Sequence, residues 1–256
     1  MTPVRLTHLG GPTVLVELDG WRILTDPTFD PPGRTYGFGL GTSSTKVAGP
    51  ALEPEQLGPV DVVLLSHDHH ADNLDDRGRA LLPSATTVLT TASGRDRLGA
   101  PNVRGLRPGE TVTLAGDGRP PLHVRATPCR HGPPLSRPVA GDVVGFALTP
   151  GDGDRVALWM TGDTVLHAPV RRLARRRDVD VLLMHLGRVR FPVTGPLRYS
   201  MDGRDAVRLV RLAAPRVAVP VHYEGWSHFS EPAERLRAAL TGAPVRWLEP
   251  GTPSEV

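Results

Sequence analysis

Cysteine, lysine and long apolar stretches are all scarce in this sequence of 256 residues. Cys129 is the only cysteine, so an internal disulfide framework is excluded. No apolar stretch reaches the roughly 18 residues that a membrane-spanning helix needs. Residues 1–6 lack a charged head followed by an apolar segment, so they do not resemble a secretion signal. We therefore expect a soluble protein of the cytoplasm.

Lys46 is the only lysine, and the other basic side chains are arginines. The net charge is only +3, although the sequence pI is about 9.6. Abundant Arg, Ala, Gly and Pro indicate a genome-wide compositional bias more than a surface for nucleic acid. The arginine run at 171–177 has the spacing of a solvated helix face, with Val170 and Leu173 on its other side. We expect a small-molecule substrate, and the sequence shows no obvious nucleic-acid partner.

Three motifs of common enzyme classes are also missing. The sequence contains no G-x-S-x-G elbow, which weighs against serine hydrolysis. It contains neither G-x-G-x-x-G nor a Walker loop, which weighs against nucleotide-cofactor chemistry. Hydrophobic residues make up 39% of the chain, enough for a packed interior, and no low-complexity linker interrupts it. We predict a single domain over residues 1–256.

Strand patterns dominate both halves of the chain. The turn signal Asp19-Gly20 between β-rich runs at 13–18 and 21–25 predicts a hairpin. Residues 28–50 are rich in Gly, Pro, Ser and Thr without a clear period, and we expect an irregular loop or lid at the mouth of the site. Further strands are expected at 61–66, 86–90, 111–114, 122–127, 143–148, 156–160, 179–184, 217–221 and 245–248, and helices at 74–82, 93–98, 165–177, 201–212 and 231–240.

The order of these elements bears on the fold class. Each half contains mostly strands, with helices between them. A sheet must bury one face against another layer, so this order fits two sheets packed face to face with helices outside. It fits a singly wound Rossmann sheet less well.

The most informative stretch follows the apolar run Val62–Leu65, where three histidines and two aspartates lie within six residues. Imidazole and carboxylate groups are the usual ligands of zinc and similar ions. His67 and His69 stand at i and i+2, so in extended chain they point to the same side and can hold one ion. The stretch therefore predicts a metal site at the end of a buried strand.

Four later apolar strands end in the same way. Because strand ends are rigid mounts, ligands far apart in the sequence can line one cavity. The residues at these ends are His131 after 122–127, Asp163 after 156–160, His185 after 179–184, and His222 after 217–221.

These marks together resemble the metallo-β-lactamase-fold hydrolase superfamily, and most closely the branch with ascorbate-6-phosphate lactonase and the N-acyl-phosphatidylethanolamine phospholipase D type enzymes. They occur in the family's order over nearly the whole chain. The matching segments are Leu9-Gly10 with Thr13–Glu17, Leu24–Pro27, Ser66–His69, His131, Thr161–Thr164 and Pro220–Tyr223.

The resemblance implies a fold and a ligand set. The fold would be a four-layer αββα sandwich of two mixed sheets, with one or two metal ions at one edge. The first ion would be held by three histidines, Asp163 would bridge to a second ion, and His222 would bind that second ion. The three histidines at the matching positions are His67, His69 and His131.

One departure from the family pattern H-x-H-x-D-H concerns the second ion. Here His69 is followed by His70, an alanine, Asp72 and Asn73. With one inserted residue, Asp72 takes the family's Asp and Asn73 replaces its last His; without it, Asp72 takes the place of that His. Either way a standard ligand is missing, and His70 is a candidate substitute. One or two Zn²⁺ ions are expected, and Mn²⁺ or Fe fits similar ligands.

The resemblance implies hydrolysis in which a metal-activated water attacks a small ester, lactone, amide or phosphodiester. Asp72 would orient the water or carry its proton. His185 is either a site residue or a core histidine that donates to a neighbour. His228 is either part of the substrate pocket or a packing residue beside His222. We treat Asp72, His185 and His228 as candidate catalytic residues.

Two other interpretations stay open at this point. One is nuclease activity, known in the superfamily, although no appended nucleic-acid-binding domain is evident. The other is a metal-binding protein without turnover, such as a sensor, a scaffold or a decayed enzyme, because of the missing second-site ligand. The sequence does not indicate the oligomeric state.

Overall fold

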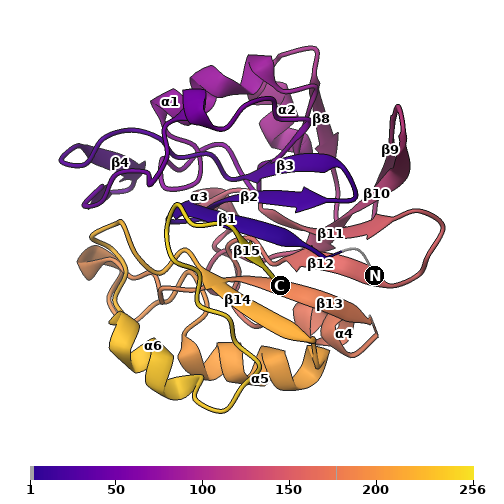
Figure 1. Cartoon of the computed structure of the whole chain (residues 1–256). Helices are drawn as coiled ribbons and strands as arrows, with labels where there is room; N and C mark the ends of the chain where they lie inside the picture. The colour runs from indigo at the N-terminus through magenta and orange to yellow at the C-terminus, as the bar shows by residue number, and fades with distance from the viewer. Residues whose placement is uncertain (1–2, 177) are drawn as a thin grey trace.

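The computed structural model of the chain describes residues 3–176 and 178–256, and it contains two sheets packed face to face (Figure 1). The first sheet has seven strands, in the spatial order β15 (Ser254–Glu255), β1 (Arg5–Gly10), β2 (Thr13–Leu18), β3 (Trp21–Thr25), β6 (Val62–Leu64), β7 (Thr87–Thr91) and β8 (Val103–Leu106). Strands β1 to β3 are antiparallel, and β3, β6, β7 and β8 are parallel. The predicted hairpin turn is present, with positive φ at both Asp19 and Gly20.

The second sheet has six strands. Their spatial order is β14 (Val217–Val221), β13 (Val179–His185), β12 (Val156–Met160), β11 (Val144–Pro150), β10 (Arg119–Pro128) and β9 (Thr111–Gly116). Strands β9 to β12 are antiparallel, whereas β12, β13 and β14 are parallel. Both sheets are therefore mixed, as predicted.

Helices cover the outer face of each sheet (Figure 1). Those of the first half are α1 (Asp76–Leu81) and α2 (Ala92–Leu98); the second half has α4 (Ala168–Arg176), α5 (Gly203–Ala213) and α6 (Ala233–Ala239). Short helical turns occur at α3 (Arg137–Ala140), η1 (Pro54–Gln56), η2 (Leu82–Ser84) and η3 (Pro192–Thr194). This arrangement confirms the predicted four-layer αββα sandwich.

The run at 62–65 is apolar throughout because it is buried on both faces of its sheet. Val62 and Leu64 point between the two sheets, where they pack with Phe146 and Leu183 of the second sheet. Val63 points the other way, into the cluster beneath the helices of the first half. A parallel strand covered on both sides has no polar face, which is why the sequence shows no alternation there.

Two segments correct the sequence-based assignment. Residues 28–50 are not irregular throughout, because β4 (Thr35–Gly39) and β5 (Thr42–Thr45) pair as an antiparallel hairpin. No strand forms at 245–248 within the described residues; Val245 makes an isolated bridge, and Trp247 and Leu248 pack into different apolar clusters. The sequence also did not predict β8, α3 or β15.

Helix boundaries differ from the predicted ones by one to three residues, and aspartate caps set two of them. Asp75 accepts a hydrogen bond from Gly78 N, so α1 begins at Asp76 rather than at 74. Asp202 accepts from Asp205 N and starts α5 in the same way. The predicted helix at 165–177 begins at Ala168, and its last residue, Arg177, lies outside the described residues. Among the residues described, no helix is both long and apolar enough to cross a membrane.

Candidate metal centre

The loop after β6 carries the first group of candidate ligands. Ser66 N donates to Asp26 Oδ1 at 2.6 Å, which fixes the backbone where the strand ends. Ser66 Oγ lies 2.9 Å from His67 Nδ1, so the other ring nitrogen of His67 is directed toward the site. His67 is completely buried, and its Nε2 lies 3.2 Å from His70 Nδ1.

His67, His70 and His131 form a buried group whose potential ligand atoms lie within 4.8 Å of one another. His131 Nδ1 lies 2.8 Å from the Tyr199 carbonyl oxygen and donates to it, which leaves Nε2 as the ligand atom. Burial and the neighbouring imidazoles lower the pKa of His67, and they lower the pKa of His70 to about 3. Neutral imidazole is the form that binds a metal ion, so these histidines are ready to do so.

His69 does not join this group, in contrast to the predicted pairing of His67 with His69. Its Nε2 lies 2.7 Å from the carbonyl oxygen of Ala140, at the end of α3. Gly141 follows with a φ of +69°, and a Cβ atom there would lie 2.2 Å from the His69 ring. His70 lies with His67 and His131 instead, and His69 as a ligand stays a prediction.

A second buried group contains Asp72, Asp163 and His222, again with candidate ligand atoms within 4.8 Å of one another. Asp163 Oδ1 lies 2.8 Å from His222 Nδ1, and Asp72 Oδ2 lies 3.3 Å from His222 Nε2. Gly162 precedes Asp163 with a φ of +63°, and a Cβ atom there would lie 2.7 Å from the Val144 carbonyl oxygen. Only glycine fits this turn, which aims Asp163 at the site.

The electrostatics of this second group suit a cation. Burial disfavours charge on His222, but the two flanking carboxylates outweigh it and raise its pKa to about 10. Burial would also raise the pKa of Asp72 and Asp163, yet the adjacent imidazoles keep both below the usual value. Asp72 Oδ1 and Asp163 Oδ2 are buried without a hydrogen-bond partner among the described residues. Unpartnered buried carboxylate oxygens fit a metal ion.

Asn73 and His185 face a third carboxylate, that of Asp26, rather than either ligand group. Asn73 Nδ2 donates to Asp26 Oδ2 at 3.2 Å, and His185 Nε2 lies 3.2 Å from the same oxygen. Burial raises the pKa of Asp26, although the hydrogen bond with His185 opposes that shift. Asn73 therefore braces Asp26, and neither His70 nor Asn73 completes the second group.

His228 lies against Asp72, where the sequence left its role open. Its Nε2 is 3.1 Å from Asp72 Oδ2, and its Nδ1 is 2.5 Å from Ser44 Oγ on β5. The hairpin thus reaches the site, as the prediction of a lid at its mouth requires. The sequence reasoning missed Ser44 and Tyr199, because both lie in segments without a chemical motif.

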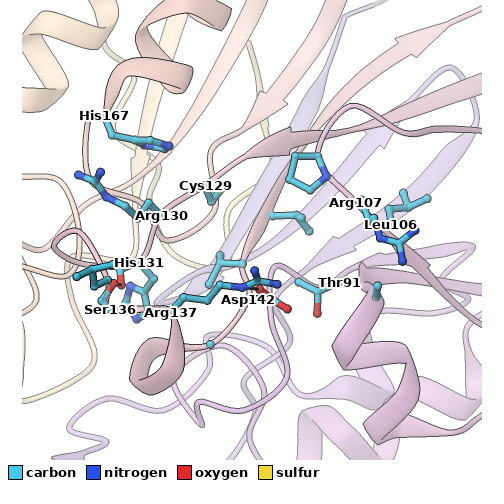
Figure 2. A pocket seen from close by; sticks show the side chains of 16 residues that line it. Thr91, Leu106, Arg107, Cys129, Arg130, His131, Ser136, Arg137, Asp142 and His167 are labelled. Atoms are coloured by element: carbon cyan, nitrogen blue, oxygen red, sulfur yellow. Dashed lines mark hydrogen bonds and ion pairs between the residues drawn. The ribbon is translucent and has the colours of Figure 1, made fainter.

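A cavity of about 470 Å³ opens beside His131 (Figure 2). Figure 2 shows His131 at one edge, with Arg130 and His167 on one side and Arg137 with Asp142 near the middle. Other members of the two ligand groups do not line this cavity. Cys129 also lines it, and its Sγ donates to the Thr161 carbonyl oxygen at 2.9 Å, so it serves as a structural thiol.

Comparison with known proteins gives a consistent family. A family model described as "Beta-lactamase superfamily domain" matches residues 21–223. A UPF0173 metal-dependent hydrolase from Carboxydothermus hydrogenoformans is 29% identical over 256 residues, covering 97% of this chain and 98% of the relative. One from Deinococcus radiodurans is 30% identical over 213 residues, covering 79% of this chain and 86% of the relative.

Solved structures show the same fold at lower identity. An isothiocyanate hydrolase from Delia radicum gut bacteria superposes with a TM-score of 0.80 and covers 98% of both chains. Its sequence is 21% identical to this one, so the likeness concerns the arrangement of sheets and helices.

Proposed function

Because the chain belongs to the UPF0173 metal-dependent hydrolases of the β-lactamase superfamily, we propose that it hydrolyses a small ester, lactone, amide or phosphodiester. The observation that carries this proposal is the convergence of two buried ligand groups, His67/His70/His131 and Asp72/Asp163/His222, at the ends of strands from both sheets. Buried clusters of ligand-type side chains from so many separate strand ends are typical of a metal-dependent active site.

We propose Zn²⁺ as the metal, since imidazole and carboxylate ligands favour it, with Mn²⁺ or Fe as alternatives. The three histidines would hold a first ion. Asp72, Asp163 and His222 would hold a second, and Asp163 also interacts electrostatically with His67 and His131, as a bridging ligand should. When bound, such an ion lowers the pKa of a water molecule and stabilises negative charge on the substrate.

The residues around Asp72 would handle protons. Its carboxylate lies between the imidazoles of His222 and His228, at 3.3 and 3.1 Å. We propose that Asp72 orients the attacking water and that His228 exchanges a proton with it, since both are within hydrogen-bond reach. His185 would act indirectly, by positioning Asp26 beneath the Ser66 backbone.

The finer assignment is part of the proposal. The likeness to the ascorbate-6-phosphate lactonase and phospholipase D type branch favours lactones and phosphodiesters as the first substrates to try. A small-molecule substrate, the lack of an obvious nucleic-acid partner and a cytoplasmic location remain predictions of the sequence.

The function can be tested with Asp163→Asn. We expect the variant to lose both bound metal, measured by elemental analysis, and turnover of a panel of lactones, phosphodiesters, esters and amides. The amide has nearly the same shape as the carboxylate but lacks the negative charge with which the two carboxylate oxygens would bind a metal ion. Asp180→Asn is the matched control, because Asp180 is also buried but lies at the start of β13, where it pairs with Arg155 and Arg216. Full metal content and activity in Asp163→Asn would refute the assignment.

A further inference from the structure

A small apolar cavity, which we call the aromatic slot, lies directly over the first ligand group. Its volume is about 120 Å³. It is lined by Phe38, Leu40, Thr42, His70, His131, Ala140, Phe191, Thr194 and Tyr199. His70 and His131 belong to the slot and to the ligand group at once, so whatever fills the slot touches the histidines of the site.

Aromatic rings form the walls of the slot. The ring centroid of Phe38 lies 5.1 Å from that of His70 and 6.0 Å from that of Phe191. The contact between Phe38 and Phe191 is edge to face. Phe191 lies 5.8 Å from Tyr199 and is stacked on His228 at 5.6 Å. No Asp, Glu, Lys or Arg is among the described residues that line the slot. Rings in such edge-to-face arrangements favour another ring or a hydrocarbon between them.

Leu40 gives an independent indication that the slot opening serves an apolar ligand. It stands at the tip of the β4–β5 hairpin with 74% of its surface exposed and a φ of +47°. Glycine or asparagine would adopt this left-handed conformation with less strain than leucine does. A polar side chain there would also expose no apolar surface to water. An exposed leucine held there places hydrocarbon at the mouth of the slot.

The volume of the slot limits which chemical groups fit into it. A dry apolar cavity of about 150 Å³ in a protein interior is known to bind benzene. The slot is a little smaller and open to solvent at Leu40, so it holds one ring or one branched hydrocarbon group, not a whole substrate. Since its floor consists of His70 and His131, the occupant is the part of the substrate next to the reacting bond.

We propose that the aromatic slot selects substrates that carry an uncharged aromatic or branched hydrocarbon group beside the bond to be hydrolysed. This inference rests on the proposed hydrolytic function for its role in turnover, but the binding of the group itself does not. Phe38, Leu40 and Phe191 are then specificity-determining residues that contact this group.

The turnover test compares methyl phenylacetate with methyl acetate, which share a leaving group and differ only in the ring. We expect kcat/KM to favour the phenyl ester by at least about tenfold, the discrimination that even small hydrocarbon differences produce in an apolar pocket. The variant Leu40→Asn/Phe38→Ser should bring the ratio of the two kcat/KM values close to one, whatever its effect on the absolute rates. Val193→Asn is the matched control, because Val193 is also exposed, at 63%, but does not line the slot.

A binding test separates this inference from the proposed function. Binding of 2-phenylethanol and of ethanol to metal-depleted protein is followed by NMR. We expect 2-phenylethanol to bind at least about tenfold more tightly, as one apolar group in a pocket allows, and to lose this advantage in the double variant. Slot-dependent binding without turnover of any ester would support the slot and count against ester hydrolysis.

Other results would overturn the inference. One is equal binding of the two alcohols, or binding that the double variant leaves unchanged, whatever the turnover results. Another is sedimentation with phosphatidylcholine vesicles, or self-association, that is lost in Leu40→Asn. Either of those would assign the apolar rim to a lipid surface or to a second copy of this chain.

Discussion

At the scale of single residues, the loop after β6 gives two adjacent histidines different surroundings. The family spacing points to His67 and His69, yet His70 is the histidine that lies with His67 and His131. His69 instead contacts the Ala140 carbonyl oxygen. Sequence spacing fixes side-chain direction only while the chain stays extended, and this loop does not stay extended.

This difference predicts unequal effects of two similar substitutions. His70→Gln should weaken Zn²⁺ binding by more than about 100-fold, because a direct ligand is lost, whereas His69→Gln should cost at most about 10–100-fold, the range for residues that support ligands. Competition with a coloured chelator measures both affinities. The reverse order would restore His69 as the ligand.

The lowered pKa of His70 predicts how the metal-free protein responds to acid. Its pKa is about 3 in the fold against 6.5 for an ordinary histidine, so between these values the unfolded chain binds a proton that the folded chain does not. The free energy of unfolding should therefore fall below pH 6.5, by about 1.4 kcal/mol per pH unit for this residue. Urea denaturation between pH 6.5 and 4.5 measures the slope, which should be shallower in His70→Gln.

His222 acts in the opposite direction. Its pKa is raised to about 10 by the two carboxylates, so its contribution to stability is fully present below pH 6.5. That contribution is lost as the pH rises through 10. Together the two histidines predict a stability maximum near neutral pH for the metal-free protein.

At the scale of elements, a buried ion pair anchors the β4–β5 hairpin. Lys46, directly after β5, places its Nζ 2.8 Å from Asp75 Oδ2, and the two side chains are 3% and 0% exposed. Asp75 also accepts backbone N–H groups from Phe29 and Asp30. The pair thus ties the hairpin to the loop that carries the ligands and holds Ser44 against His228.

Replacing the chain's only lysine should therefore be costly. Lys46→Met leaves Asp75 buried without its counter-charge, and we expect a loss of about 3–5 kcal/mol in the free energy of unfolding. Urea denaturation measures it. Arg34→Met, directly before β4, is the control and should have a much smaller effect, because Arg34 and its main partner Asp76 are exposed. Equal effects of the two substitutions would contradict the anchoring role.

At the scale of the whole molecule, the candidate metal centre joins the two sheets. His67, His70 and Asp72 follow β6 of the first sheet, whereas Asp163 and His222 follow β12 and β14 of the second. Both sheets share one apolar core between them. A bound ion therefore cross-links the two halves and binds only the folded arrangement.

Removing the metal should lower the melting temperature of the entire chain. An ion present at 100 times its dissociation constant adds about 2.7 kcal/mol. For a chain of this size each kcal/mol shifts Tm by about 2–4 °C, so chelation should lower Tm by roughly 5–10 °C. Calorimetry with and without EDTA measures the shift, and added Zn²⁺ should reverse it. A single transition in both states would support the predicted single domain over residues 1–256, whereas two separate transitions would count against it.

The sequence by itself determined which strands end in ligand-type side chains, and from their order it gave the sandwich of two sheets. Those features are local, because an apolar run followed by His or Asp is visible without knowing its neighbours. Only the tertiary structure decided that His70 lies with His67 and His131, that His228 meets Asp72, and that the β4–β5 hairpin lines an aromatic slot beside them. These are contacts between segments as far apart as Ser44 and His228, and no local periodicity encodes such contacts.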